Sequence, residues 1–339
     1  MIKVCVTGCG VVGPTHMKAL QQNNGGELYA VCDIIPERAD SCAAEYGAKA
    51  YYDFDAMLRN DKIESVHICT PHYLHVPMAV KALAAGKHVV LEKPVCMTRD
   101  ELTQLYSAKE NASGKLCVML QNRTNNSVEE LKRLADTDKS LGGLIGINGV
   151  MHWQRDEKYY RSEPWRGKWQ TEGGGAVINQ AVHLLDLINY FGHAKSIRAS
   201  ISTKRLAGVI EVEDTADAYI TLENGAGATF FATNNSPANR PFQLELCYEN
   251  AVFRYSDNVL YRIEGEKIEI IARDSGTALG KSYWGAGHAR VIHDFYESLR
   301  LGGDNYISLD DAYSTAELTC ALYESARQNK TISIGEINK

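Results

Sequence analysis

The sequence predicts an α/β protein of two domains, and three observations lead to this prediction. The chain is 339 residues long, which suits two domains better than one. In residues 1–121, apolar strand segments alternate with helical segments, the pattern of a doubly wound parallel sheet of the Rossmann type. From residue 122 onward, extended segments are joined by short turns, which indicates a mainly antiparallel sheet. We therefore place one domain at 1–121 and a second α/β domain at 122–339.

The composition is that of a globular protein and excludes some partners. Hydrophobic residues make up 45% of the chain and charged residues 23%. The net charge of −6 argues against a nucleic-acid or membrane partner, because proteins that bind those polyanions are usually basic. No apolar run reaches the roughly 18 residues of a transmembrane helix, and the first residues lack the layout of a signal peptide. We expect a cytoplasmic protein whose nine cysteines are free and bind no metal.

The first strand and helix surround a glycine-rich turn. Residues 2–7 predict a strand and residues 14–22 predict a helix. Between them stands GCGVVG, whose glycines suit a tight turn, a close approach of the backbone to a phosphate and close packing of the helix on the strand. A diphosphate would bind at the helix N-terminus, where unpaired N–H groups favour an anion. The residues expected to contact it are Gly8, Gly10, Val11, Val12 and Gly13.

The next strand ends on an acidic residue. The run LYAVCD places Asp33 about 20 residues after the last glycine of the turn. A carboxylate there accepts hydrogen bonds from the adenosine ribose and repels a 2′-phosphate, so we expect NAD in preference to NADP. Arg38 lies close enough in the sequence to weaken that preference. Strand, turn, helix and acid together are more specific than the glycines alone, which also form turns without a ligand.

The rest of the first domain brings two further motifs to the same edge of the sheet. We predict strands and helices in alternation at 65–69, 74–85, 88–91, 98–111 and 116–120. Because ligands bind at the carboxyl ends of parallel strands, GCGVVG, TPHYLH (70–75) and EKP (92–94) should face one crevice. Glu92 and Lys93 then stand at the ligand-facing edge and not in the core. Pro94 fixes φ and removes a backbone donor, and a cis bond before it would turn the chain sharply.

The second domain contains one helix that stands out. A long strand is predicted at 144–153, and the glycines at 173–175 open a helix at about 176–190. Asn179 and His183 are four residues apart, so they share one face of that helix. The plain alternative is a core histidine beside a helical asparagine. The other segments, extended except for the last two, lie at 197–203, 215–222, 226–233, 242–248, 251–255, 259–263, 286–301 and 310–328.

Two stretches carry a family resemblance. CTPHYLHVPMAVKALAAGKHVVLEKP (69–94) and GGGAVINQAVHLLDL (173–187), together with GCGVVG, resemble the glucose–fructose oxidoreductase / inositol dehydrogenase / MocA (Gfo/Idh/MocA) family. The combination is highly specific and covers the first half of the chain and the start of the second. The resemblance implies a Rossmann domain followed by an α/β domain with a large open, mainly antiparallel sheet. It also implies hydride transfer between NAD(P) and a sugar, cyclitol or related carbonyl compound.

The resemblance implies roles for residues at the matching positions. Lys93 would hydrogen-bond the reacting oxygen, and its bond to Pro94 is commonly cis in the family. His183 would be the catalytic acid/base. The position of Asn179 often holds aspartate, and an asparagine can orient a hydroxyl but cannot take a proton. The residues expected along the nicotinamide are Thr70, Pro71, His75 and Glu92.

The segment 159–175 is rich in aromatic and cationic residues. In the family, a loop of this kind covers the cofactor and contributes to the substrate pocket. Aromatic faces with polar donors suit a carbohydrate ring, although an ordinary loop between domains is the alternative. Arg166 is a candidate for contact with the cofactor. The substrate candidates besides Lys93, Asn179 and His183 are Trp165, His152, Arg123 and Tyr283.

We therefore expect an NAD-dependent dehydrogenase that acts on a secondary alcohol of a sugar, glycoside or cyclitol. His183 would take the hydroxyl proton as hydride leaves carbon, and the Lys93 cation would stabilise the developing alkoxide. One alternative uses NAD without net redox, cleaving or epimerising a glycoside through a keto-sugar intermediate. An alternative from another class is a non-enzymatic NAD-binding sensor. No metal is expected, because His288, His293 and Asp294 lack the spacing of a ligand set.

The C-terminal sheet is expected to mediate assembly. An open sheet face does not readily stay uncovered in water. In the family, the same sheet of another subunit usually covers it, so we expect a homodimer or a homotetramer.

Overall fold

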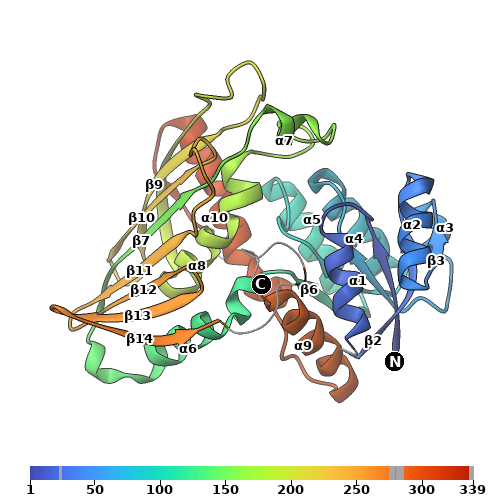
Figure 1. The fold of residues 1–339 in the computed structure, drawn as a ribbon, viewed down its shortest axis with the longest axis horizontal. Helices are drawn as coiled ribbons and strands as arrows, with labels where there is room; N and C mark the ends of the chain where they lie inside the picture. The colour runs from blue at the N-terminus through green and yellow to red at the C-terminus, as the bar shows by residue number, and fades with distance from the viewer. Residues whose placement is uncertain (23–24, 275–278, 280–285, 336–339) are drawn as a thin grey trace. The chain divides into compact units, whose positions relative to one another are not determined.

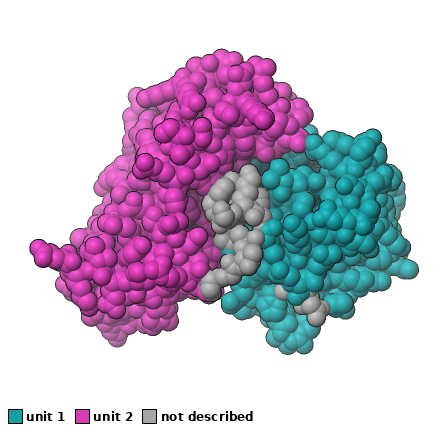
Figure 2. Space-filling model, viewed as in Figure 1, with its two compact units in different colours: residues 1–121, 276–312 teal, residues 122–275, 313–339 magenta. Residues whose placement is uncertain are grey.

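The computed structural model describes residues 1–22, 25–274, 279 and 286–335, and the chain divides into two compact units (Figure 1). Unit 1 comprises residues 1–121 and 276–312, and unit 2 comprises residues 122–275 and 313–339, shown in teal and magenta in Figure 2. Within the described ranges, no helix combines the length and the apolar character that crossing a membrane requires.

Unit 1 is built on a six-stranded parallel sheet. Its order is β3-β2-β1-β4-β5-β6, the doubly wound arrangement of a dinucleotide-binding domain, which confirms the predicted fold class. The strand order reverses between β1 and β4, so the ends of these strands border the crevice where such folds bind ligands. The strands are β1 (Ile2–Thr7), β2 (Gly26–Cys32), β3 (Lys49–Tyr51), β4 (Ser65–Ile68), β5 (His88–Leu91) and β6 (Leu116–Val118).

Helices flank this sheet, and one of them comes from the far end of the chain. Phe295 and Tyr296 of α9 are buried with Met17 of α1 and Val6 of β1 in one hydrophobic cluster. This burial explains why a segment near residue 290 belongs to the first unit. The helices of unit 1 are α1 (Gly13–Gln21), α2 (Pro36–Tyr46), α3 (Phe54–Leu58), α4 (His75–Ala84), α5 (Arg99–Glu110) and α9 (Gly287–Leu301).

Unit 2 is built on a nine-stranded sheet of order β14-β13-β12-β11-β7-β10-β9-β8-β15. The pair β7–β10 is parallel and the other pairs are antiparallel, so the expected mainly antiparallel sheet is present. The strands are β7 (Leu144–His152), β8 (Ala194–Ser202), β9 (Thr215–Leu222), β10 (Gly227–Thr233), β11 (Gln243–Tyr248), β12 (Val252–Ser256), β13 (Val259–Glu264), β14 (Lys267–Arg273) and β15 (Ile332–Ser333).

Helix α8 lies directly against this sheet. A Cβ added to Gly149 of β7 would stand 2.7 Å from Cδ1 of Ile188 and 3.1 Å from Cδ1 of Leu184, so the glycine permits the close contact. The helices of unit 2 are α6 (Asn126–Thr137), α7 (Glu157–Arg161), a π-helix (Ala176–Ala181) and α8 (Val182–Gly192), and α10 (Leu309–Gln328) begins in unit 1 and continues in unit 2 from residue 313.

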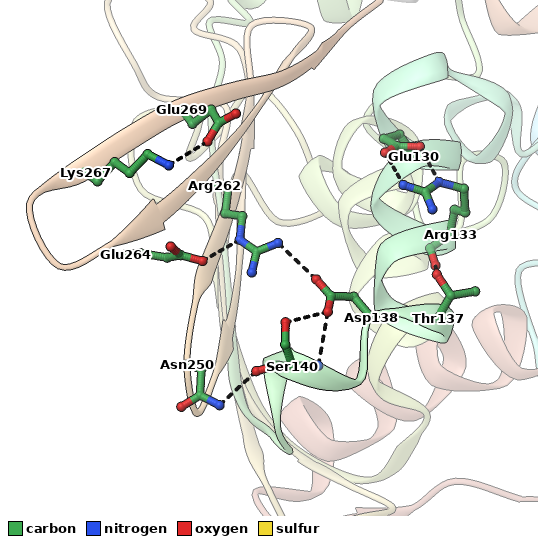
Figure 3. A network of polar contacts seen from close by, with 10 residues as sticks. All are labelled: Glu130, Arg133, Thr137, Asp138, Ser140, Asn250, Arg262, Glu264, Lys267 and Glu269. Atoms are coloured by element: carbon green, nitrogen blue, oxygen red, sulfur yellow. Dashed lines mark hydrogen bonds and ion pairs between the residues drawn. The ribbon is translucent and has the colours of Figure 1, made fainter.

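A polar network ties α6 to the strand hairpin at the edge of the sheet (Figure 3). Asp138 ends α6 and accepts a hydrogen bond from the Arg262 Nη1 of β13 at 3.0 Å. Arg262 also donates to Glu264 at 2.7 Å, and Asp138 accepts from the backbone N–H of Ser140 at 3.1 Å. These partly exposed contacts connect the end of α6 to strand β13 of the hairpin.

Candidate active site

In the glycine-rich turn after β1, the backbone is closely packed at Gly8 and Gly13 and open at Gly10. Gly8 has φ +93, and a Cβ there would lie 2.4 Å from the carbonyl oxygen of Cys69. A Cβ on Gly13 would lie 2.1 Å from the oxygen of Gly8, whereas one on Gly10 would meet nothing within 4 Å. No side chain caps the N-terminus of α1 at Val12. The open side at Gly10 and the uncapped helix end fit a phosphate group.

Asp33 links the end of β2 to this turn. Its Oδ2 accepts a hydrogen bond from the Cys9 N–H at 2.8 Å, and its Oδ1 accepts one from the Ile35 N–H at 2.9 Å. Each carboxylate oxygen has a second lone pair, which fits the hydroxyls of a ribose. Val11 is exposed at the tip of the turn, and Arg38 lies half-buried in the first turn of α2. These residues therefore fit an NAD molecule bound at this edge.

His75 joins the two other motifs at the strand ends. Its Nδ1 lies 2.8 Å from the oxygen of Pro94 and its Nε2 lies 2.9 Å from the oxygen of Thr70. Burial lowers the pKa of His75, whereas the hydrogen bonds to the carbonyl oxygens of Pro94 and Thr70 act in the opposite direction. Pro71 comes just before a short 3-10 turn that leads into α4. The Lys93–Pro94 bond is cis, as the family resemblance implies.

Glu92 is buried behind Lys93, with 4% of its surface exposed. Its Oε2 accepts the backbone N–H of Lys93 at 3.1 Å, and its Oε1 lies 3.0 Å from Nε2 of His16 and 3.6 Å from Nε2 of His288. Burial opposes ionisation, but hydrogen bonds from the two histidines outweigh it and hold the pKa of Glu92 well below its ordinary value. The cluster thus keeps a carboxylate fixed next to the lysine.

The histidine cluster continues into the core as a hydrogen-bonded chain. Nδ1 of His16 lies 2.9 Å from Nδ1 of His67, whose Nε2 lies 2.7 Å from the Tyr296 hydroxyl. In the described part of the chain, His16, Glu92 and His288 are close enough to share a metal ion, with donor atoms within 4.8 Å of one another. The contact between His16 and Glu92 has the length of a hydrogen bond. We therefore assign to the cluster the role of holding the Glu92 carboxylate in position.

The helix that follows the GGG turn presents two polar side chains from an otherwise buried segment. Between 172 and 189 every residue is buried except Asn179 and His183, which are half-exposed. Asn179 lies in the π-helix and His183 in the first turn of α8, and π-helical turns are frequent at functional sites. Buried Glu213 accepts the N–H groups of Gly175 and Val177, both at 2.9 Å, which fixes the start of this helix. The two residues singled out from the sequence are therefore the two partly exposed side chains of this segment, and their catalytic roles stay a prediction.

Glu172, also in unit 2, is a hydrogen-bond partner of Asn179. The carboxyl group is fully buried, and its Oε1 accepts a hydrogen bond from Nδ2 of Asn179 at 2.6 Å. Its Oε2 accepts the backbone N–H of Gly167. Burial raises the pKa of Glu172 to about 7, although the hydrogen bonds from Gly167 and Asn179 and the charge of Arg166 oppose this rise.

The loop 153–169 gathers aromatic rings and guanidinium groups. Arg166 stacks on the Tyr159 ring with its Cζ 4.4 Å from the centroid and on the Trp165 ring at 4.7 Å, and its Nη1 also contacts the Tyr159 hydroxyl. Arg155 stacks on the rings of Trp153 and Tyr159, with its Cζ 4.9 Å from each centroid. His152 is exposed at the end of β7. The two candidates Trp165 and Arg166 therefore contact each other directly, and Arg166 also contacts Tyr159.

Arg123 has a clear structural role in unit 2. Its Nε donates to Oδ2 of Asp186 at 3.0 Å, its Nη2 donates to Oδ1, and both side chains are buried. The pair anchors α8 one turn after His183. Tyr283, the other secondary substrate candidate, lies outside the described residues. Of the residues considered for a metal, His288 is buried near Glu92, whereas His293 is exposed and Asp294 pairs with Arg290 at 2.8 Å.

Glu92 was expected along the nicotinamide, but its partner His16 was not predicted, and neither was a supporting role for Glu172 or Tyr159. His16 and Glu92 are 76 positions apart, so only the fold brings them together. Glu172 does stand directly before the GGG turn, and Tyr159 opens the aromatic loop, but burial is what gives each its role. An acidic residue next to a glycine turn was the one available signal for Glu172.

Family profiles match both halves of the chain. Residues 2–120 match the oxidoreductase family with an NAD-binding Rossmann fold, and residues 128–254 match the GFO/IDH/MocA C-terminal domain. The chain belongs to the Gfo/Idh/MocA family of oxidoreductases. Its first unit is therefore an NAD-binding Rossmann domain, and the Asp33 preference for NAD agrees with that description.

Relatives of this Gfo/Idh/MocA protein include sugar-active enzymes. Levoglucosan dehydrogenase from Pseudarthrobacter phenanthrenivorans is 24% identical over 91% of this chain and 90% of that protein. A solved structure of a levoglucosan dehydrogenase in complex with NADH and levoglucosan has the same fold, with a TM-score of 0.89 over 99% of this chain and 100% of that one. The WlbA dehydrogenase from Bordetella pertussis, in complex with NADH and UDP-GlcNAcA, is 26% identical, with a TM-score of 0.86 over 99% of each chain. An alpha-N-acetylgalactosaminidase from Shewanella oneidensis is 30% identical over 52% of this chain and 41% of that protein.

Proposed function

We propose that this protein is an NAD-dependent dehydrogenase that oxidises a secondary alcohol of a sugar, glycoside or cyclitol, or reduces the corresponding ketone. The observation that carries the proposal is the pair Asn179 and His183, the two half-exposed side chains of an otherwise buried helix. The sugar and sugar-nucleotide ligands of the relatives support the substrate class. The Rossmann unit with Asp33 supports NAD in preference to NADP.

Each catalytic residue has a distinct task in this proposal. Bound NAD would accept the hydride. His183 takes the hydroxyl proton, because a neutral imidazole is the side-chain base best matched to neutral pH. Lys93, whose backbone N–H is held by the carboxylate of Glu92, stabilises with its side-chain cation the negative charge that develops on the substrate oxygen. Asn179 orients a substrate hydroxyl through hydrogen bonding.

Absorbance of reduced nicotinamide tests this proposal. The protein with NAD is mixed with levoglucosan, myo-inositol, glucose and glucose-6-phosphate, and we expect a rising signal with at least one of these polyols. Replacing His183 or Lys93 with alanine should lower turnover by roughly 10²–10⁴-fold. His293→Ala removes an exposed histidine and is the matched control. Undiminished turnover in His183→Ala would refute its assignment as the base.

A second candidate is redox-neutral cleavage or epimerisation of a glycoside. The similarity to an alpha-N-acetylgalactosaminidase over 52% of this chain favours it. In such a reaction the sugar is oxidised at one carbon and the same hydride is returned later, so no NADH accumulates. Release of nitrophenol from nitrophenyl glycosides, with flat nicotinamide absorbance, would identify this chemistry. A rising absorbance without sugar release would exclude it for those substrates.

We also propose a homodimer or homotetramer in the cytoplasm, formed through the outer face of the nine-stranded sheet. On that face Tyr219 is 55% exposed and is paired across the strands with Thr229, while Phe231 and Val150 are only partly covered. The opposite face packs against α8. Light scattering should give a multiple of the chain mass, and Tyr219→Lys should lower it. A monomer mass for the unmodified protein at micromolar concentration would refute the assembly.

A further inference from the structure

The amide of Asn179 is held in one orientation by its neighbours. Its Nδ2 donates to Oε1 of Glu172 at 2.6 Å and lies 3.4 Å from the Tyr159 hydroxyl oxygen. An ionised carboxylate only accepts hydrogen bonds, so it selects the nitrogen side of the amide. The carbonyl oxygen Oδ1 therefore points away from Glu172, and Asn179 is one of the two half-exposed residues of its helix.

The protonation state of Glu172 determines whether this orientation persists. Oε2 accepts the backbone N–H of Gly167, which cannot rotate away, so a proton on the carboxyl group belongs on Oε1. An Oε1–H group is a donor and meets the amide of Asn179 directly. The amide then gains a hydrogen bond by turning over, with Oδ1 toward Glu172 and Nδ2 on the substrate side.

We propose that Glu172 is a positioning residue that fixes Asn179 with its carbonyl oxygen toward a substrate hydroxyl, and that protonation of Glu172 reverses the amide and lowers turnover. The kinetic part rests on the proposed dehydrogenase function, whereas the orientation of the amide does not. The role was hidden in the sequence, because nothing there shows that the residue before the GGG turn is fully buried.

The surroundings of Glu172 place this change near neutral pH. Burial is the main cause that raises the pKa of Glu172 to about 7, and the nearby charge of Glu213 acts in the same direction. Arg166 and the hydrogen bonds from Gly167 and Asn179 act in the opposite direction. Burial also raises the pKa values of Tyr159 and Tyr160, so both phenols stay neutral across the working range.

The variant Glu172→Gln imitates the protonated carboxyl group. A glutamine has one acceptor oxygen, which the Gly167 N–H requires, and its NH₂ group then faces Asn179. The amide of Asn179 should turn over at every pH. Glu211→Gln is the matched control, because Glu211 is an exposed carboxylate that accepts the Trp169 N–H at 3.3 Å and, among the residues that the structure describes, forms no hydrogen bond with Asn179.

The direct test is the side-chain amide resonance of Asn179 in protein labelled with ¹⁵N-asparagine, identified by its absence in Asn179→Ala. In the unmodified protein we expect this resonance to shift with a midpoint near pH 7, and in Glu172→Gln we expect it to stay at the low-pH position. Glu211→Gln should behave as the unmodified protein. A resonance that does not move between pH 5.5 and pH 8.5 in the unmodified protein would overturn the proposal. A resonance in Glu172→Gln that moves with pH as it does in the unmodified protein would overturn it as well.

The kinetic test uses levoglucosan and myo-inositol as probes with NAD. At pH 8.5 we expect kcat of Glu172→Gln to be lower by roughly 10- to 100-fold, the loss of one oriented hydrogen bond, and at pH 5.5 the two proteins should converge. The ratio of the two proteins at each pH removes any pH dependence that they share. A ratio independent of pH would overturn the kinetic role. If no probe turns over, the proposed function fails for these sugars, and the amide resonance still decides the positioning of Asn179.

Discussion

Replacing Arg123 with alanine should lower the free energy of unfolding of unit 2 by about 3–5 kcal/mol. Arg123 and Asp186 form a two-point ion pair, and their side chains are 8% and 1% exposed. Without Arg123, the buried carboxylate keeps the hydroxyl of Thr315, at 2.8 Å, as a hydrogen-bond donor, which cannot neutralise its charge. The magnitude is the cost of leaving a buried charge without its counter-ion.

Arg133→Ala is the matched control for this prediction. Arg133 also makes a two-point contact, with Glu130, but 57% of its side chain is exposed (Figure 3). Solvent screening limits such a pair to about 0–1 kcal/mol. The two variants thus share an interaction geometry and differ in burial.

Urea unfolding followed by tryptophan fluorescence measures both variants, since Trp153, Trp165 and Trp169 all lie in unit 2. The midpoint should fall for Arg123→Ala at an unchanged slope. The double variant Arg123→Met with Asp186→Leu should recover most of the loss, because apolar groups of similar size replace a buried pair at little cost. Equal losses in Arg123→Ala and Arg133→Ala would refute the reasoning from burial.

The glycine turn and the buried carboxylate allow three more tests. Gly10→Ala should change the free energy of unfolding by no more than about 1 kcal/mol. It should abolish NAD binding measured by calorimetry, because the added Cβ occupies the open side of the turn where the phosphate is expected. Retained binding would contradict the assigned site. Gly13→Ala should unfold unit 1, seen by circular dichroism, because its Cβ would lie 2.1 Å from the oxygen of Gly8; a native spectrum would contradict this. The pKa of Glu172 is raised from 4.5 to about 7, so stability should fall by about 3 kcal/mol as pH rises across that interval. Glu172→Gln should remove this slope in urea titrations, and an unchanged slope would contradict the assignment.

Local patterns were enough to predict the elements that carry the site. The turn GCGVVG between strand and helix, and the helix after the GGG turn, appear where apolar periodicity and glycine spacing indicated. The helix was predicted as one α-helix, and its first part, Ala176–Ala181, is a π-helix. The difference follows from the Glu213 contacts with Gly175 and Val177, which anchor the start of the helix from a distant strand end. Such long-range anchors leave no trace in a sequence window.

The second half of the chain also contains elements without a clear local signal. Helix α6 (Asn126–Thr137) and strand β14 (Lys267–Arg273) were not predicted. Strand β14 is largely exposed at the edge of the sheet, so it lacks the alternation of buried and exposed residues that marks a strand. Its pairing with β13 supplies the order that its own sequence does not specify.

Buried carboxyl groups hold the start of the helix that carries Asn179 and His183. A buried carboxylate must be met by donors, so it draws backbone N–H groups and side chains into fixed positions. Glu213 does this for Gly175 and Val177, and Glu172 does it for Gly167 and Asn179. These hydrogen bonds offset the free-energy cost of burying each carboxyl group. An apolar residue in the same place would not hold the donors in position.

The asparagine at position 179 follows from this arrangement, although the family resemblance allows aspartate there. The distance from Asn179 Nδ2 to Glu172 Oε1 is 2.6 Å, and an aspartate would place two carboxylates at that separation. Like charges so close cannot both ionise, so Asn179→Asp should share one proton with Glu172 at neutral pH and titrate in two coupled steps. Carboxyl ¹³C shifts should show two steps in the variant and one in the unmodified protein at this site. Two independent titrations at ordinary acid pH would contradict the coupling. The carboxyl group that the family often has on the helix is therefore supplied, in this chain, by Glu172 beside it.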